Sequence, residues 1–100
     1  MKIAAFLLLL AASAFGDTCR VLIGGTGCRT RQLAIKRIFE NLPDTVRVTI
    51  LPREEAPELN QRYFIVTTKD ESPTSDELVQ ALGRRAKHYH VISVTPQIPR

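Results

Sequence analysis

The stretch that does most to define the fold runs from residue 23 to residue 43 and reads IGGTGCRTRQLAIKRIFENLP. In this stretch the end of an apolar segment is followed by a glycine-rich turn and then by apolar side chains at helical spacing. Glycine permits the positive φ angles of such a turn, and the spacing predicts an amphipathic helix from Arg29 to Asn41. Pro43 ends that helix. The stretch therefore predicts a strand, a tight turn and a helix in succession.

The helix is expected to bury one broad apolar stripe against the rest of the protein. The residues of this stripe are Leu33, Ile35, Ile38, Phe39 and Leu42. The turn places Cys28 at the start of the helix, where the positive end of the helix dipole and the charges of Arg29 and Arg31 favour a thiolate. The sequence thus predicts a reactive cysteine at this position.

The periodicity of the remaining chain predicts four further elements downstream and one strand upstream of the helix. The expected strands are residues 19–24, 46–51, 63–69 and 91–95, and the expected second helix is residues 75–87. Ser75 is expected to cap this second helix, and Leu78, Val79 and Leu82 to face inward. The polar segment LPREEAPELNQ between the middle strands is expected to be a mobile loop.

This order of elements, βαββαβ, predicts an α+β fold. With antiparallel pairing it is a ferredoxin-like sandwich, in which two helices cover one face of a four-stranded antiparallel sheet of order 4-1-3-2. The last strand then lies beside the first and runs opposite to it. We therefore expect His88 and His90 to reach the same end of the sheet as the loop that carries Cys28.

The first residues, MKIAAFLLLLAASAFG, combine a positive charge at Lys2, an apolar run and small residues, which is typical of a secretory signal. The run is shorter than the roughly 20 residues of a membrane span, so cleavage after Ala14 or Gly16 is expected to release a protein without stable membrane insertion. Pro96 and Pro99 are expected to stop strand pairing. The predicted parts are a signal peptide at 1–16, a domain at 17–95 and an extended tail at 96–100.

Composition limits the classes of function. About 85 residues remain after the signal, which is enough for one domain with a modest core. The chain has 14 Lys and Arg against 10 Asp and Glu, a net charge of +4, and these charges are spread along the sequence, which favours solubility over a nucleic-acid site. No catalytic motif spacing occurs, so we expect no enzyme.

The two cysteines are not expected to form a disulfide. Cys19 and Cys28 bracket a predicted strand whose length is roughly 17 Å, whereas bridged Cα atoms lie within about 7 Å. The sequence therefore predicts a free thiol at Cys28 in an exported protein.

The chain resembles the heavy-metal-associated domain family, which includes copper chaperones and periplasmic mercury-binding proteins. In the family's metal loop, which reads apolar, any, Gly, Met, Thr, Cys, any, any, Cys, the positions of Gly25 and Cys28 match. Ile35 and the pair Leu42-Pro43 match the helix that follows, and residues 74–78 resemble the family's Ser-Pro-Glu-Glu-Leu segment. Three positions depart from the pattern: Thr26 stands for Met, Gly27 for Thr and Arg31 for the second cysteine.

The resemblance implies a secreted, periplasmic protein that binds or transfers a soft metal ion, Cu(I), Zn(II) or Hg(II), with a metal-transporting protein as partner. Three interpretations of the cysteine site stay open. Cys28 is joined by His88 or His90 in a thiolate-imidazole metal site; or two chains share a metal ion or a disulfide through Cys28 as a homodimer; or the metal site has been lost and the fold serves protein contacts. The histidines are also typical of a solvated helix end.

A second class of function competes with metal binding. Residues 92–100, ISVTPQIPR, form an extended, proline-containing segment, which suits a secreted protease-inhibitor or propeptide-like module, or another protein-interaction module, on the same fold. This hypothesis predicts that removal of residues 97–100 abolishes activity whereas Cys28→Ser does not, and metal binding predicts the reverse. A thiol-redox role is a weaker alternative because no resolving cysteine lies within one helical turn.

Overall fold

A computed structural model describes residues 16–97 of the chain. The expectations for the signal segment before Gly16 and for the last three residues of the predicted tail lie outside the described residues. Within residues 16–97, no helix is both long enough and apolar enough to cross a membrane.

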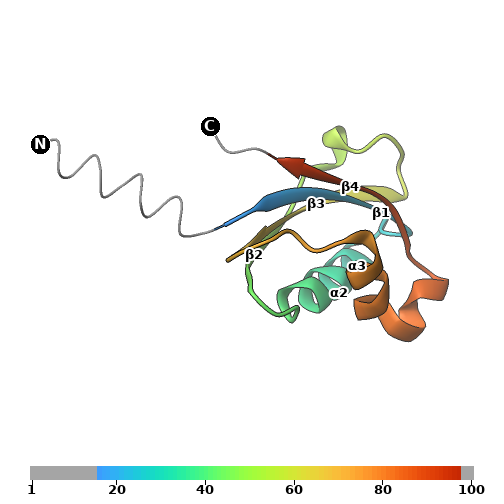
Figure 1. Ribbon diagram of the computed structural model, residues 1–100. Helices are drawn as coiled ribbons and strands as arrows, with labels where there is room; N and C mark the ends of the chain where they lie inside the picture. The colour runs from blue at the N-terminus through green and yellow to red at the C-terminus, as the bar shows by residue number, and fades with distance from the viewer. Residues whose placement is uncertain (1–15, 98–100) are drawn as a thin grey trace, which may run out of the picture.

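The described residues form one antiparallel sheet and two helices. The strands are β1 (Thr18–Gly24), β2 (Thr45–Ile50), β3 (Gln61–Thr68) and β4 (His90–Gln97); the helices are α2 (Arg29–Glu40) and α3 (Ser75–Leu82); and η1 (Arg53–Glu55) and η2 (Gly83–Lys87) are short 3-10 turns. The sheet has the order β2-β3-β1-β4, and each neighbouring pair is antiparallel. Both helices lie on the same side of the sheet (Figure 1). The predicted α+β, ferredoxin-like βαββαβ topology is confirmed.

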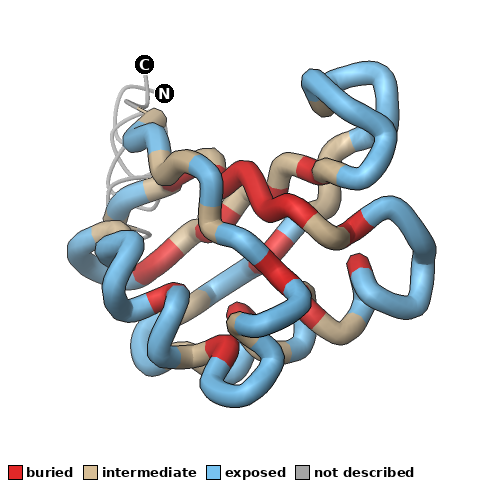
Figure 2. The backbone as a smooth tube through the Cα atoms, turned by 90° about the vertical axis from the view of Figure 1, so that its right-hand side faces the viewer, coloured by how far each residue is buried: buried red, intermediate tan, exposed pale blue. Residues whose placement is uncertain are grey.

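The core lies between the sheet and the helices. Val21 in β1 pairs with Phe64 in β3 and with Val94 in β4, so the two central strands direct alternate side chains toward the helices. Phe64 meets Phe39 of α2 edge to face, with ring centroids 5.9 Å apart, a geometry that aromatic pairs favour. Buried residues gather on these central strands and on the inward sides of the helices (Figure 2).

Helix α2 forms where the sequence predicts it, but its buried stripe is narrower. Ile35 and Phe39 are fully buried, and Ile38 and Leu42 pack partly buried at the margin of the core. Leu33 is 37% exposed, so its predicted burial is wrong. Leu33 instead borders a surface groove beside β2, the edge strand that α2 covers.

Helix α3 differs from the prediction at both ends. Its N-cap is Thr74, not Ser75, and its last residue is Leu82, because Gly83 takes a positive φ of 55° that ends the helix. The remaining residues predicted as helix form the turn η2. Leu78 and Leu82 are buried as expected, whereas Val79 is 42% exposed and does not face inward. The short helix therefore anchors to the core by two leucines.

Strand β4 continues beyond the predicted end at Thr95. Pro96 pairs with Cys19 and Gln97 with Thr18, so the segment that the prolines were expected to leave unpaired belongs to the sheet as far as Gln97. Pro96 is tolerated because β4 is an edge strand, where one side of the backbone needs no partner strand. The register shifts between Leu22 and Ile23 of β1, which leaves Ile92 as the extra residue of a bulge in β4.

Candidate functional site

The thiol of Cys28 lies at the start of α2, as predicted. Cys28 is the N-cap residue, with extended φ and ψ of −116° and 156°, and its carbonyl oxygen accepts a hydrogen bond from Gln32 N at 3.1 Å. Its side chain is exposed and makes no capping hydrogen bond. The sulfur atom is therefore open to solvent and to other molecules.

Two side-chain hydrogen bonds hold the loop that carries Cys28 in place. Thr26 is fully buried, and its hydroxyl donates a hydrogen bond to Ile23 O at 2.8 Å. Gln32, buried on α2, donates from Nε2 to Thr26 O at 2.9 Å. These two bonds tie the loop to the end of β1 and to the first turn of α2. Sequence reasoning named Thr26 only as a departure from the family pattern, and it did not single out Gln32, because a polar side chain in a helix is usually solvated.

Two neighbouring segments confine the same loop from its sides. Asn60 O accepts hydrogen bonds from Gly25 N at 2.8 Å and from Thr26 N at 2.9 Å. Gly25 has a φ of 87°, and a Cβ atom at this position would overlap the carbonyl oxygen of His88. Glycine is thus required here by both conformation and space. The loop is a fixed support for Cys28.

The histidines reach this end of the sheet, as the topology predicts. His90 pairs with Gly24 across β4 and β1, and the backbone of His88 borders Gly25. Both side chains are exposed. Among residues 16–97, no three His, Cys, Asp or Glu side chains are grouped so that they could hold a metal ion. The structure therefore brings the Cys28 and His88–His90 segments to one end of the sheet without forming such a group.

The second cysteine has a different environment. Cys19 is fully buried in the core, and both cysteines are free, which confirms that they form no disulfide with each other. Burial raises the pKa of the Cys19 thiol above its usual value, and the negative charge of Asp17 acts in the same direction. Cys19 is thus a neutral core side chain rather than a reactive thiol.

The sheet face opposite the helices carries a feature that the sequence analysis did not find. The guanidinium carbon of Arg20 in β1 lies 4.8 Å from the centre of the Tyr63 ring in β3, within the range of a cation–π contact. The Arg20 Nε atom is buried and has no hydrogen-bond partner among the described residues. Alternation along β3 was the available signal, because it places Tyr63 and Ile65 on the face opposite Phe64 and Val66.

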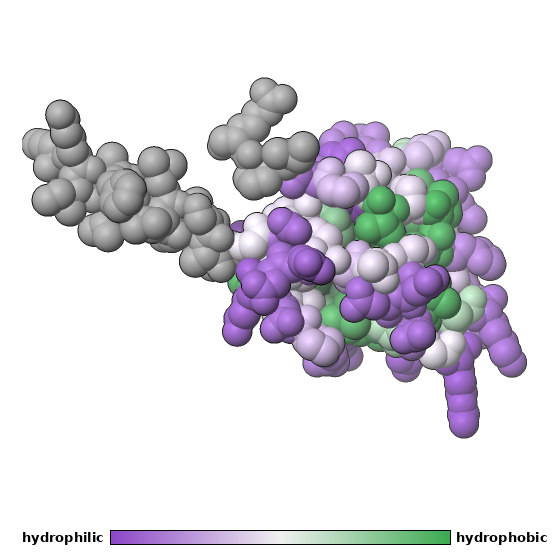
Figure 3. All heavy atoms as spheres, viewed as in Figure 1, coloured by the Kyte–Doolittle hydropathy of each residue, from purple (hydrophilic) through white to green (hydrophobic). Residues whose placement is uncertain are grey.

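Apolar side chains lie on the same face as this pair, and one of them, Leu22, is only 6% exposed. Ile65 pairs with Arg20, and Leu22 pairs with Tyr63. Ile92, the bulge residue of β4, is 48% exposed, and its Cδ1 atom lies beside Gly24. In the view of Figure 3, hydrophobic side chains reach the surface as separate patches within a mostly hydrophilic surface.

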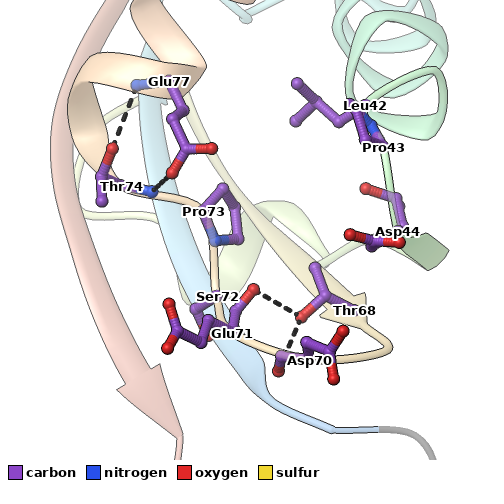
Figure 4. A pocket seen from close by; sticks show the side chains of 11 residues that line it. Leu42, Pro43, Asp44, Thr68, Asp70, Glu71, Ser72, Pro73, Thr74 and Glu77 are labelled. Atoms are coloured by element: carbon purple, nitrogen blue, oxygen red, sulfur yellow. Dashed lines mark hydrogen bonds between the residues drawn. The ribbon is translucent and has the colours of Figure 1, made fainter.

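A polar cavity of about 530 Å³ lies at the opposite end of the sheet from Cys28, where β3 ends and β2 begins (Figure 4). Asp44, Asp70, Glu71 and Glu77 line it. Thr68 also lines it, and its hydroxyl donates a hydrogen bond to Glu71 O at 3.0 Å. The sequence analysis did not indicate this cavity, because its acidic residues come from three separate loops and helix ends.

Comparison with known proteins found no family model that matches the chain, and no curated protein or solved structure that matches it. The resemblance to the heavy-metal-associated family therefore stays a prediction.

Proposed function

We propose that this chain is an exported binding protein that acts by contact with another protein, and that the uncovered face of its sheet is the docking surface. The observation that carries the proposal is the Arg20–Tyr63 pair on the two central strands. Tyr and Arg are enriched at the centres of protein interfaces because they combine a large contact area with hydrogen-bonding groups. The Nε donor of Arg20 is buried and has no partner among residues 16–97, so a docking partner could reach it only if the side chain moved.

The surroundings of the pair fit the same function. Half-buried Ile65 and exposed Ile92 supply apolar area on the same face of the sheet. The hydroxyl groups of Thr18 and Thr67 lie 3.4 Å apart on the same face and give it a polar margin. An apolar centre with a polar margin is the usual anatomy of a docking surface. Secretion is inferred from the signal-like first residues.

Photo-crosslinking in cells that produce the protein tests this proposal. A photoreactive phenylalanine analogue replaces Tyr63 in one variant and Asp76, which is exposed on α3, in a matched control. We expect a discrete adduct from position 63 that Arg20→Ala weakens, and none of that size from position 76. Equal adducts from both positions, or none from position 63, would contradict the proposal.

A protease-inhibitory module is one form of this function. It predicts that removal of residues 97–100 abolishes inhibition of a target protease whereas Cys28→Ser leaves it intact. Inhibition that survives the truncation would exclude a role for the tail.

A second candidate function, binding of a soft metal ion, is supported by the exposure of Cys28 and by its free side chain at the N-cap. Two thiolates suit Cu(I) or Hg(II), and two chains that each present Cys28 would supply them. Zn(II) would need more ligands, for which His88 and His90 are the candidates.

Anaerobic titration with Cu(I) against a competing chelator tests the metal function. We expect binding at one ion per two chains, together with dimer formation in sedimentation, and loss of both in Cys28→Ser. A His88→Ala, His90→Ala double variant that binds less tightly would favour the thiolate-imidazole alternative. Equal binding by the parent protein and Cys28→Ser would exclude the cysteine as a ligand.

A further inference from the structure

The two edges of the sheet are protected to different extents. Exposed edge strands invite pairing with other chains, and bulges or prolines prevent it. The edge strand β4 has both, since Ile92 forms a bulge and Pro96 lacks a backbone N–H. The other edge, β2, is irregular only between Thr45 and Arg47, and its remaining residues pair regularly with β3. Among the described residues, β2 pairs with β3 alone.

A groove of about 320 Å³ runs beside this less protected edge. Its walls are α2 and β2, and the residues that line it are Arg29, Leu33, Lys36, Val48, Thr49 and Ile50. Leu33 is 37% exposed and Val46, which precedes the groove on β2, is 39% exposed. The groove thus combines the apolar side chains of Leu33, Val48 and Ile50 with polar ones, and it lies directly next to unpaired strand backbone.

The charge of the groove is positive. Arg29 is exposed at the start of α2, and the first turn of this helix contains no acidic residue. Lys36 forms an ion pair with Glu40 on the same helix, with Nζ and Oε2 3.1 Å apart. An exposed pair of this kind contributes little, so Lys36 can exchange its partner at small cost. Arg47, which pairs with Thr67 and does not line the groove, adds an exposed cation to the same edge strand.

We propose that β2 and the groove beside it bind an extended acidic segment of a partner protein, which adds a strand to the sheet. This inference rests on the proposed function as a protein-binding module and names the chemistry of the partner. Backbone groups of the segment would pair with the free side of β2, which is how peptides dock on exposed sheet edges. Alternate side chains would enter the groove next to Leu33, and the others would lie beside Thr49 on the uncovered face.

A second copy of this chain fits the same edge less well. Pairing of β2 with β2 of a second molecule would place the two α2 helices on the same side of the extended sheet. The cations Arg29 and Lys36 of both molecules would then share one seam, and like charges in such positions repel. An acidic segment removes this repulsion and satisfies the same backbone groups.

The test uses the purified protein labelled with ¹⁵N and a short synthetic peptide in which Val and Glu alternate. A matched peptide has Lys in place of Glu. We expect the Glu peptide to shift amide resonances of residues 46–50 and of Leu33, and the Lys peptide to leave them unchanged. The opposite edge, β4, is expected to show no shift.

Two substitutions test whether the peptide binds in the groove. Arg29→Glu and Leu33→Asp change exposed side chains that line the groove, and Arg84→Glu changes an exposed cation in η2 as the matched control. We expect binding of the Glu peptide to weaken roughly tenfold or more in the groove variants, because each removes a contact of the peptide or repels it, and to stay unchanged in Arg84→Glu. Unaltered spectra outside the groove show that each variant is folded.

Three results would overturn this inference: shifts that map to β4, equal binding of the Glu and Lys peptides, or self-association of the protein through residues 46–50 without any peptide. Failure here is distinguishable from failure of the proposed function, because the crosslinking at position 63 reports on the uncovered face. An adduct at position 63 with no peptide bound at β2 would reject only the groove.

Discussion

Thr74 and Glu77 cap helix α3 by exchanging two hydrogen bonds. Glu77 N donates to Thr74 Oγ1 at 3.2 Å, and Thr74 N donates to Glu77 Oε1 at 3.0 Å. This reciprocal pair is a capping box, which satisfies two backbone N–H groups at the helix start. It also forms one wall of the acidic cavity, since both residues line it (Figure 4).

The first prediction separates the observed cap from its neighbour. Thr74→Ala should lower the free energy of unfolding by about 1 kcal/mol, because it removes the side-chain acceptor of the Glu77 N–H group. Ser75→Ala should change it by less than about 0.5 kcal/mol, as expected for a surface position. Urea unfolding measures both values. A larger loss in Ser75→Ala than in Thr74→Ala would refute the capping assignment.

The second prediction concerns two glycines with positive φ. Gly25→Ala should destabilise the protein by more than about 2 kcal/mol, because the backbone conformation is strained for alanine and its Cβ would overlap His88 O. Gly83→Ala should cost less, about 1–3 kcal/mol from backbone strain alone, since it shares the positive φ but no heavy atom of the described residues lies within 4 Å of the new Cβ. Thermal unfolding of the two variants provides the comparison, and equal midpoints would contradict it.

The third prediction concerns the reactivity of the two thiols. Cys28 is exposed and Cys19 is buried, so a thiol reagent should label one cysteine rapidly in the folded protein and the second only as the protein unfolds. In denaturant both should react at once. Cys28→Ser should abolish the rapid phase and leave the slow one. Rapid labelling that persists in Cys28→Ser would mean that Cys19 is accessible.

The fourth prediction concerns stability at alkaline pH. Burial raises the pKa of Cys19 in the folded protein above its value in the unfolded chain, which is about 8.5. The unfolded chain therefore loses this proton first as the pH rises. By linkage, the contribution of Cys19 to stability is complete below about pH 8.5 and is lost as the pH rises through the folded pKa.

Denaturant titrations at a series of pH values measure this effect. Cys19→Ala should flatten the loss of stability above about pH 8.5, because alanine has no proton to lose. Cys28→Ser is the matched control and should retain the slope of the parent protein. Identical slopes for the parent and Cys19→Ala would show that other groups cause the loss.

The order of elements and the antiparallel topology could be predicted from the sequence because periodicity and helix boundaries are local signals. The cap at Thr74 could also have been predicted, since Thr followed three residues later by Glu is a sequence signature of a capping box. The exposure of Leu33 and Val79 could not be predicted from the sequence. Apolar spacing shows which side of a helix faces inward, but the width of the buried stripe depends on how the helix crosses the sheet.

The sequence likewise predicted some features of the candidate sites and not others. The position of Cys28 at the start of α2 and the arrival of His90 beside Gly24 followed from the predicted topology. The contact of Arg20 with Tyr63 did not, because it joins two strands far apart in the sequence and depends on their register. A shift of one residue in that register would place one of the two side chains on the opposite face.

The sequence by itself determined the βαββαβ order, the helix start at Cys28 and the distance that keeps the two cysteines apart, because hydrophobic period, glycine turns and strand length are properties of neighbouring residues. Only the tertiary structure decided which side chains meet across strands, where β4 ends and which sheet edge stays open beside a basic groove. These features depend on register and on the packing of helices against the sheet, which arise from contacts between residues distant in the chain.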